Sequence, residues 1–143
     1  MVNTELDMLE IHLNTTWDSV DYSVLLEGAK TFTGLSKPLT LKQNLAKFSS
    51  YSPKIIYHEI EYPQSFRPKT PWSMEDFQRN ALLTQVFPRL SGSQAPQRDD
   101  VLVVADIDEI PRPETLNLLR ACHFPKRLTL QSKFYYCRSN HHL

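Results

Sequence analysis

An α/β fold with a mainly parallel sheet is the fold class that this 143-residue sequence predicts. Helical and strand-like apolar patterns alternate along the chain, which is the order expected when helices connect parallel strands. The strongest strand pattern, Val101–Ala105, is a continuous apolar run, and such runs are typical of strands covered on both faces. The length is ordinary for one domain, so we expect residues 1–143 to form a single unit.

The first half of the chain predicts a helix, a strand, a second helix and a second strand. Apolar side chains recur at helical spacing over residues 6–17, which indicates the first helix. The stretch "DYSVLLEG", residues 21–28, is a short run of strand formers and predicts a buried strand. After glycine and proline breakers, residues 42–48 favour a helix, and "KIIYHEIEY", residues 54–62, favours the next strand.

The second half predicts a stiff loop followed by helix, strand and helix. Three prolines in residues 63–71 exclude a regular ladder, and residues 72–87 resume a helical pattern with Ser73 placed to cap it. Val101–Ala105 then forms the third expected strand, and a helix is expected to begin at Pro113. Residues 127–137 predict a final extended run.

Composition excludes several classes of function. The 16 basic and 16 acidic residues cancel, so no long-range field favours nucleic acid or an anionic membrane as a partner. No apolar run approaches the roughly 18 to 20 residues of a membrane span, and the first ten residues lack the order of a signal peptide. We therefore expect no membrane contact from this chain itself. Cys122 and Cys137 lack the spacing of a zinc site or a disulfide framework.

Two carboxylates follow the most apolar predicted strand. In an extended backbone Asp106 and Asp108 project to the same side, and parallel strands bind ligands at their carboxyl ends. Two unpaired carboxylates in one space repel each other, and a divalent cation such as Mn²⁺ or Mg²⁺ removes that repulsion. Such an ion would take further oxygens from a substrate diphosphate, which indicates a nucleotide-bearing ligand. The alternative is that the acids cap the following helix or pair with Arg98 and Arg112.

Several segments carry a resemblance to a known family. "NTELDMLEIHLN", "DYSVLLEGAKTFTGLSKPL", "KIIYHEI", "EDFQRNAL" and "DVLVVADIDEIPRPETLNLLR" resemble, in this order, the glycosyltransferase family that contains β-1,4-mannosyl-glycoprotein 4-β-N-acetylglucosaminyltransferase. The resemblance implies a GT-A-like nucleotide-sugar-binding fold and inverting transfer of N-acetylglucosamine from UDP-N-acetylglucosamine to a mannose of an N-glycan. It also implies a location on the lumenal side of the Golgi membrane.

The resemblance implies roles for particular residues. Asp106 and Asp108 correspond to the acidic motif that holds the metal and the donor diphosphate, with Glu109 in support. Arg79 is expected to reach the phosphates or to hold Asp106 by a two-pronged contact, unless it is a surface arginine beside the nearby glutamate at helical spacing. Glu27, which ends a predicted strand, is expected at the ligand-binding rim, unless it is simply solvated.

Other candidates are weaker. Thr31, Thr33 and Lys37 match the family pattern after the first strand, except that Leu35 and Ser36 replace its centre, and they suggest donor contacts. Trp72 could cover a sugar, although a tryptophan that opens a helix more often packs into the core. The adjacent histidines His141 and His142 could supply a late metal ligand, although a plain chain tail is the simpler interpretation.

Two departures from the family leave alternatives open. Family members continue on both sides of the matched region, with a strand before it and an acceptor-binding section after it, so we expect the domain to be incomplete at both ends. The general base is not identifiable, and the chain alone is not assumed to catalyse transfer. One alternative is a haloacid-dehalogenase-like phosphatase that uses Asp106 as the nucleophile, and the other is a non-catalytic sugar-nucleotide-binding module.

Overall fold

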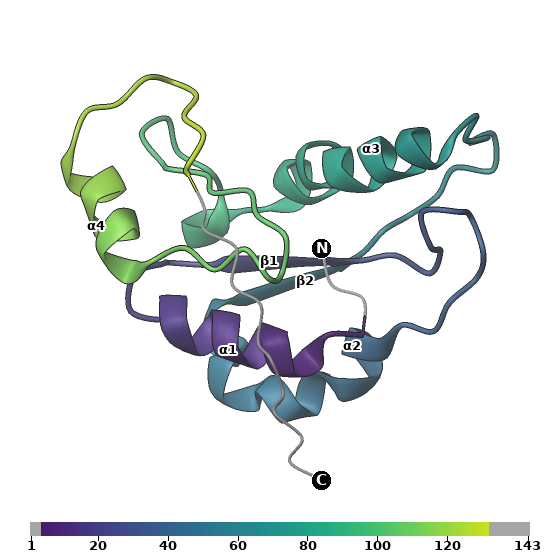
Figure 1. Ribbon diagram of the computed structural model, residues 1–143, viewed down its shortest axis with the longest axis horizontal. Coiled ribbons are helices and arrows are strands. Elements are labelled where there is room, and N and C mark those ends of the chain that lie inside the picture. The colour runs from purple at the N-terminus through teal and green to yellow at the C-terminus, as the bar shows by residue number, and fades with distance from the viewer. Residues whose placement is uncertain (1–3, 132–143) are drawn as a thin grey trace, which may run out of the picture.

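The computed structural model describes residues 4–131. From Leu6 to Ala81, helices and strands alternate as predicted. Figure 1 shows the helices on both sides of a short two-stranded sheet. The helices and strands are α1 (Leu6–Thr16), β1 (Ser23–Glu27), α2 (Thr40–Asn44), a 3₁₀ segment (Leu45–Lys54), β2 (Ile55–Glu59), α3 (Pro71–Ala81) and α4 (Pro113–Ala121).

The two strands are parallel, as predicted. Ser23 lies opposite Ile55 and Glu27 lies opposite Glu59, so both strands end at the same edge of the sheet. Because successive side chains of a strand point to opposite faces, each strand contributes to two separate cores.

One core lies between the sheet and α1, and the other lies between the sheet and α3 (Figure 1). Leucines spaced along α1 meet β1 and the 3₁₀ segment in the first core, which contains Leu9, Leu13, Leu25, Leu41 and Phe48. The second core contains Leu26, Ile60, Ala81, Leu82 and Val86. The described residues therefore form a three-layer α/β/α arrangement built on a sheet of two strands.

The start of α3 is specified by its own sequence. Thr70 is the N-cap: its side chain accepts from the Ser73 amide, and the Ser73 side chain completes a capping box. Pro71 occupies the first helical turn, where its missing N–H has no cost. Ser73 thus lies inside the helix and is not the cap that we predicted from the sequence. After Ala81 the chain widens into a π turn, Leu82–Val86.

The third predicted strand, Val101–Ala105, is not formed. Within residues 4–131, β1 pairs only with β2, and the apolar run has no strand beside it. A strand needs a partner for its backbone groups and cover for its side chains, and the described residues provide no such partner and little cover. Val101, Leu102, Val103 and Val104 are accordingly 40%, 48%, 38% and 64% exposed. The mainly parallel sheet that we predicted has two strands in the part of the chain that the structure describes.

Near the end of the described residues, α4 contacts the segment that precedes β1, at the amino-terminal end of that strand. Arg120 of α4 donates to the Asp21 carboxylate at 2.6 Å and to the Ser19 carbonyl at 3.2 Å, just before β1 begins. Residues 127–131 form no strand, and the rest of the predicted final run lies outside the described residues. No helix in the described part of the chain combines the length and apolar character that crossing a bilayer requires.

Candidate functional site

The acidic motif forms a tight turn. The Glu109 amide donates to the Asp106 carbonyl at 3.1 Å, and the Asp106 amide donates to the Glu109 carboxylate at 3.0 Å. Ile107 and Asp108 therefore lie at the centre of a β-turn, and the extended backbone that we assumed for the two aspartates is absent. Glu109 closes this turn through both its amide and its carboxylate.

Arg79 of α3 contacts the acidic turn directly. Its Nη2 donates to Asp106 Oδ2 at 2.9 Å, and its Nε donates to Glu75 Oε1 at 3.0 Å. The contact with Asp106 uses one nitrogen and is not the two-pronged contact that we predicted. Arg79 thus combines the two roles that we considered: it contacts Asp106, and it pairs with Glu75, one helical turn earlier.

The charge of Arg79 is stabilised by these two acids. Partial burial by itself would lower the pKa of Arg79, but the hydrogen bonds and charges of Asp106 and Glu75 outweigh it and raise this pKa. The Arg79 and Asp106 side chains are 40% and 41% exposed, so the ion pair remains open to solvent and to a ligand.

His12, which no sequence pattern singles out, also holds the acidic turn. His12 Nδ1 lies 3.0 Å from the Ile107 carbonyl oxygen, across 95 positions of sequence. The Ile107 side chain packs against the core between α1 and the sheet. No local pattern marks His12, because its partner is a backbone carbonyl far along the chain.

Glu27 does not lie at an exposed rim, which corrects our expectation. Its side chain is fully buried, and its carboxylate accepts from the Leu41 amide at 2.8 Å and the Lys42 amide at 3.0 Å. The Tyr57 hydroxyl also donates to it at 2.9 Å. The carboxylate thus accepts hydrogen bonds from two backbone amides in the first turn of α2. Burial, and to a smaller extent the hydrogen bond to Glu27, raises the pKa of Tyr57 well above its usual range.

A hollow of about 560 Å³ lies beyond the carboxyl ends of the two strands. It is lined by Ala29, Lys30, Glu59, Ile60, Glu61 and Tyr62. The Lys30 ammonium lies 5.1 Å from the centre of the Tyr62 ring. The acids at this edge are neutralised, because Lys42 pairs with Glu59 at 2.7 Å and Arg89 pairs with both oxygens of Glu61.

The loop after β1 holds the weaker candidates. The Thr31 and Thr33 hydroxyls bond each other at 2.9 Å, and the Lys37 amide donates to the Ala29 carbonyl. Lys37 Nζ is buried and has no hydrogen-bond partner among the described residues. Trp72 is 72% exposed and is therefore not the core residue that its position favoured.

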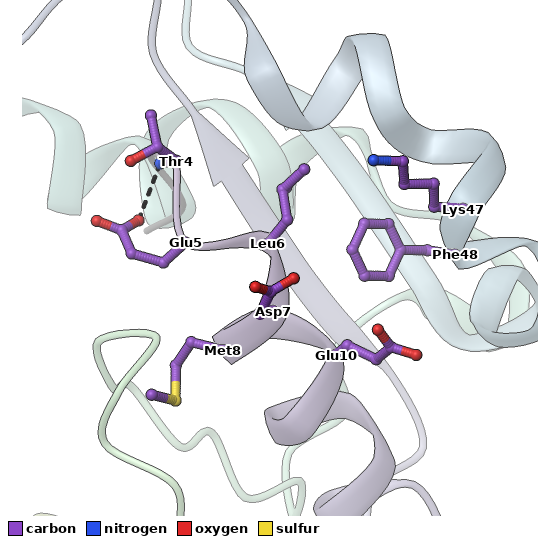
Figure 2. Close-up of a pocket in the computed structure, with 8 residues that line it drawn as sticks. All are labelled: Thr4, Glu5, Leu6, Asp7, Met8, Glu10, Lys47 and Phe48. Atoms are coloured by element: carbon purple, nitrogen blue, oxygen red, sulfur yellow. Dashed lines mark hydrogen bonds between the residues drawn. The ribbon is translucent and has the colours of Figure 1, made fainter. Parts of the chain in front are cut away.

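A second hollow, of about 500 Å³, lies at the start of α1 and contains none of the predicted site residues. Figure 2 shows the Leu6 and Phe48 side chains in its wall, with the Thr4 amide donating to the Glu5 carboxylate. Asp7 and Glu10 lie on the same helical turn. This hollow is separate from the acidic turn.

A metal ion at the acidic turn would need ligand atoms beyond those that the described residues bring together. Residues 4–131 contain no group of three or more histidine, cysteine, aspartate or glutamate side chains placed to hold one. Of the three carboxylates in the acidic turn, that of Glu109 already accepts from the Asp106 amide, and one oxygen of Asp106 accepts from Arg79. His141 and His142 lie outside the described residues.

Comparison with known proteins assigns the chain to a family. β-1,4-Mannosyl-glycoprotein 4-β-N-acetylglucosaminyltransferase of Homo sapiens is 27% identical over 121 residues, which cover 83% of this chain and 22% of the human protein. The proteins of the same name from Rattus norvegicus and Mus musculus are each 26% identical over 121 residues. No solved structure matches the chain. The model of glycosyltransferase family 17 matches residues 1–141, nearly the whole sequence, and the chain belongs to that family.

Proposed function

We propose that this chain carries the donor-binding part of an enzyme that transfers N-acetylglucosamine from UDP-N-acetylglucosamine to a mannose of an N-glycan. Membership of glycosyltransferase family 17 and the names of the three mammalian relatives support this proposal. The chain spans 22% of the length of these relatives, so the complete reaction is proposed for a longer protein. We extend the proposal to a GT-A-like fold and to the Golgi lumen.

The observation that carries the proposal is the acidic turn with its arginine. Asp106 and Asp108 supply carboxylate oxygens, which Mg²⁺ and Mn²⁺ prefer, and a diphosphate would complete the coordination shell. A bound divalent cation would offset the negative charge that develops on the diphosphate as the sugar leaves. The half-exposed ion pair leaves Asp106 accessible for this role.

Arg79 has two tasks in this proposal. While no donor is bound, it neutralises Asp106 and so limits the repulsion between the two aspartates. When the donor is bound, its guanidinium is close enough to the turn to bond a phosphate oxygen, since Glu75 keeps it on this side of α3. Glu27 has no part in donor binding here, because its buried carboxylate already accepts three hydrogen bonds.

The test is calorimetric titration of the protein with UDP in the presence and absence of Mn²⁺. We expect Asp106→Asn and Asp108→Asn to abolish the Mn²⁺-dependent part of UDP binding, because each substitution removes a negative charge that attracts the divalent cation. Asp99→Asn is the matched control, since Asp99 is an exposed aspartate two positions before the apolar run. Unchanged binding in the Asp106 and Asp108 variants would refute the proposal.

Activity assays separate the proposal from its alternatives. Transfer of radiolabelled N-acetylglucosamine to an N-glycan by a protein with the full length of the relatives is the expected result. UDP binding without any transfer in that longer protein would instead favour a binding module. Hydrolysis of an aryl phosphate that is lost in Asp106→Asn would favour the phosphatase, which the family match makes the poorer explanation.

A further inference from the structure

We infer that His12 is a positioning residue for the donor site: it fixes the peptide group that joins Ile107 to Asp108 and so sets the direction of the Asp108 carboxylate. This inference rests on the proposed function, because it concerns how the acidic turn is held ready for a cation and a diphosphate.

The contact is direct and is built on a rigid element. The Ile107 carbonyl can only accept a hydrogen bond, so the His12 nitrogen at 3.0 Å, Nδ1, must carry the proton. His12 lies on α1 between Leu9 and Leu13, which are 0% and 1% exposed. The imidazole is therefore supported by a helix that is anchored in the core on both sides of it.

The bonded carbonyl belongs to the central peptide of the turn. β-Turns of types I and II differ mainly by a flip of this peptide, and the flipped form requires a positive φ at the third residue, here Asp108. No non-glycine residue among those described has a positive φ, so the turn is in the unflipped form. The hydrogen bond from His12 opposes the flip, which would reverse the Ile107 carbonyl and change φ at Asp108, the backbone angle that orients its side chain.

His12 and Arg79 hold the turn from different layers of the fold. Arg79 comes from α3 on one face of the sheet and bonds the Asp106 side chain, whereas His12 comes from α1 on the other face. A cation shared by two carboxylates tolerates only small errors in their placement. Each aspartate thus has its own support, one through the side chain and one through the backbone.

Two substitutions at one position distinguish positioning from general stability. Asparagine places its amide nitrogen where Nδ1 lies, and so can still donate to the Ile107 carbonyl, whereas glutamine places its amide nitrogen nearer to Nε2. Glutamine is the better helix former, so a simple effect on α1 predicts that His12→Asn is the worse variant. A positioning role predicts the opposite order.

The experiment measures Mn²⁺-dependent UDP binding by calorimetry and hydrogen exchange of the Glu109 amide, which closes the turn. We expect His12→Gln to weaken the binding by about three- to tenfold, as the loss of one hydrogen bond implies, and to speed the exchange. His12→Asn should stay close to the unmodified protein in both measurements. His58→Asn is the control, since His58 bonds Gln85 on the α3 side of the sheet.

The outcomes separate this inference from the proposed function. If Asp106→Asn abolishes the binding but His12→Gln leaves it unchanged, the inference is wrong and the proposed function stands. If His12→Asn is as impaired as His12→Gln, the hydrogen bond from Nδ1 is not what matters, and the inference is again wrong. If Asp106→Asn has no effect, the proposed function fails, and the role of His12 in it fails too.

Discussion

Glu27→Gln is expected to destabilise the protein by about 3 kcal/mol. The single oxygen of glutamine can keep the hydrogen bonds from the Lys42 amide and the Tyr57 hydroxyl, which share Oε2. Its amide nitrogen then faces the Leu41 amide, which donates to Oε1 at 2.8 Å in the present structure. A hydrogen bond to a charged group contributes about 1.5–3 kcal/mol, and a buried donor left unsatisfied costs about 1–3 kcal/mol.

Thermal unfolding followed by circular dichroism provides the measurement. At roughly 3 °C per kcal/mol for a chain of this size, Tm should fall by about 10 °C. Glu59→Gln is the matched control, because Glu59 lies opposite Glu27 in the sheet but makes an exposed ion pair with Lys42, which contributes about 0–1 kcal/mol. If Glu27→Gln lowers Tm no more than Glu59→Gln does, the buried carboxylate does not stabilise α2 and this reasoning is refuted.

Three further predictions concern the same edge of the sheet. A methyl group at Gly28 would overlap the Tyr62 hydroxyl, so Gly28→Ala should destabilise the protein by about 1–3 kcal/mol, and adding Tyr62→Phe should recover part of this loss in chemical unfolding. Lys37→Met should raise the free energy of unfolding by about 1 kcal/mol or more, because it removes a buried ammonium group that has no hydrogen-bond partner among the described residues. A lower free energy of unfolding would contradict this prediction. Because the pKa of Tyr57 is raised in the folded protein, the unfolded chain loses the hydroxyl proton at a lower pH, and stability should fall as the pH rises above about 10. Tyr57→Phe should make this fall shallower, which a comparison of unfolding at about pH 9 and about pH 11 measures.

The elements that the sequence predicted well are those whose signals are local. Both paired strands, residues 23–27 and 55–59, fall within the predicted runs, because strand formers and flanking breakers lie next to each other in the sequence. The start of α3 was missed by only one or two residues, since Thr70, Pro71 and Ser73 form one continuous signal. The cap was misplaced because threonine and serine are both good caps, and only the geometry decides between them.

The elements that the sequence did not predict depend on distant partners. The Val101–Ala105 run has strong strand propensity, but whether a strand forms is decided by the backbone beside it, and the described chain provides none there. The contact between His12 and the acidic turn joins positions 95 residues apart, so no spacing rule could reveal it. Arg79 was identified because its segment resembles the family, and the predicted contact with Asp106 is present, although through one nitrogen only.

Glu27 and Asp106 show why a shared pattern does not imply a shared role. Both follow a short apolar run, so sequence reasoning placed both at a ligand-binding rim. Glu27 is the last residue of a paired strand, and the start of α2 lies over it, so its carboxylate is fully buried and accepts three hydrogen bonds. Asp106 follows an unpaired segment, stays 41% exposed and accepts from a single side chain, Arg79, among the contacts described. Whether such an acid stays accessible therefore depends on what the chain packs over it after the strand ends, and of these two acids only Asp106 is exposed.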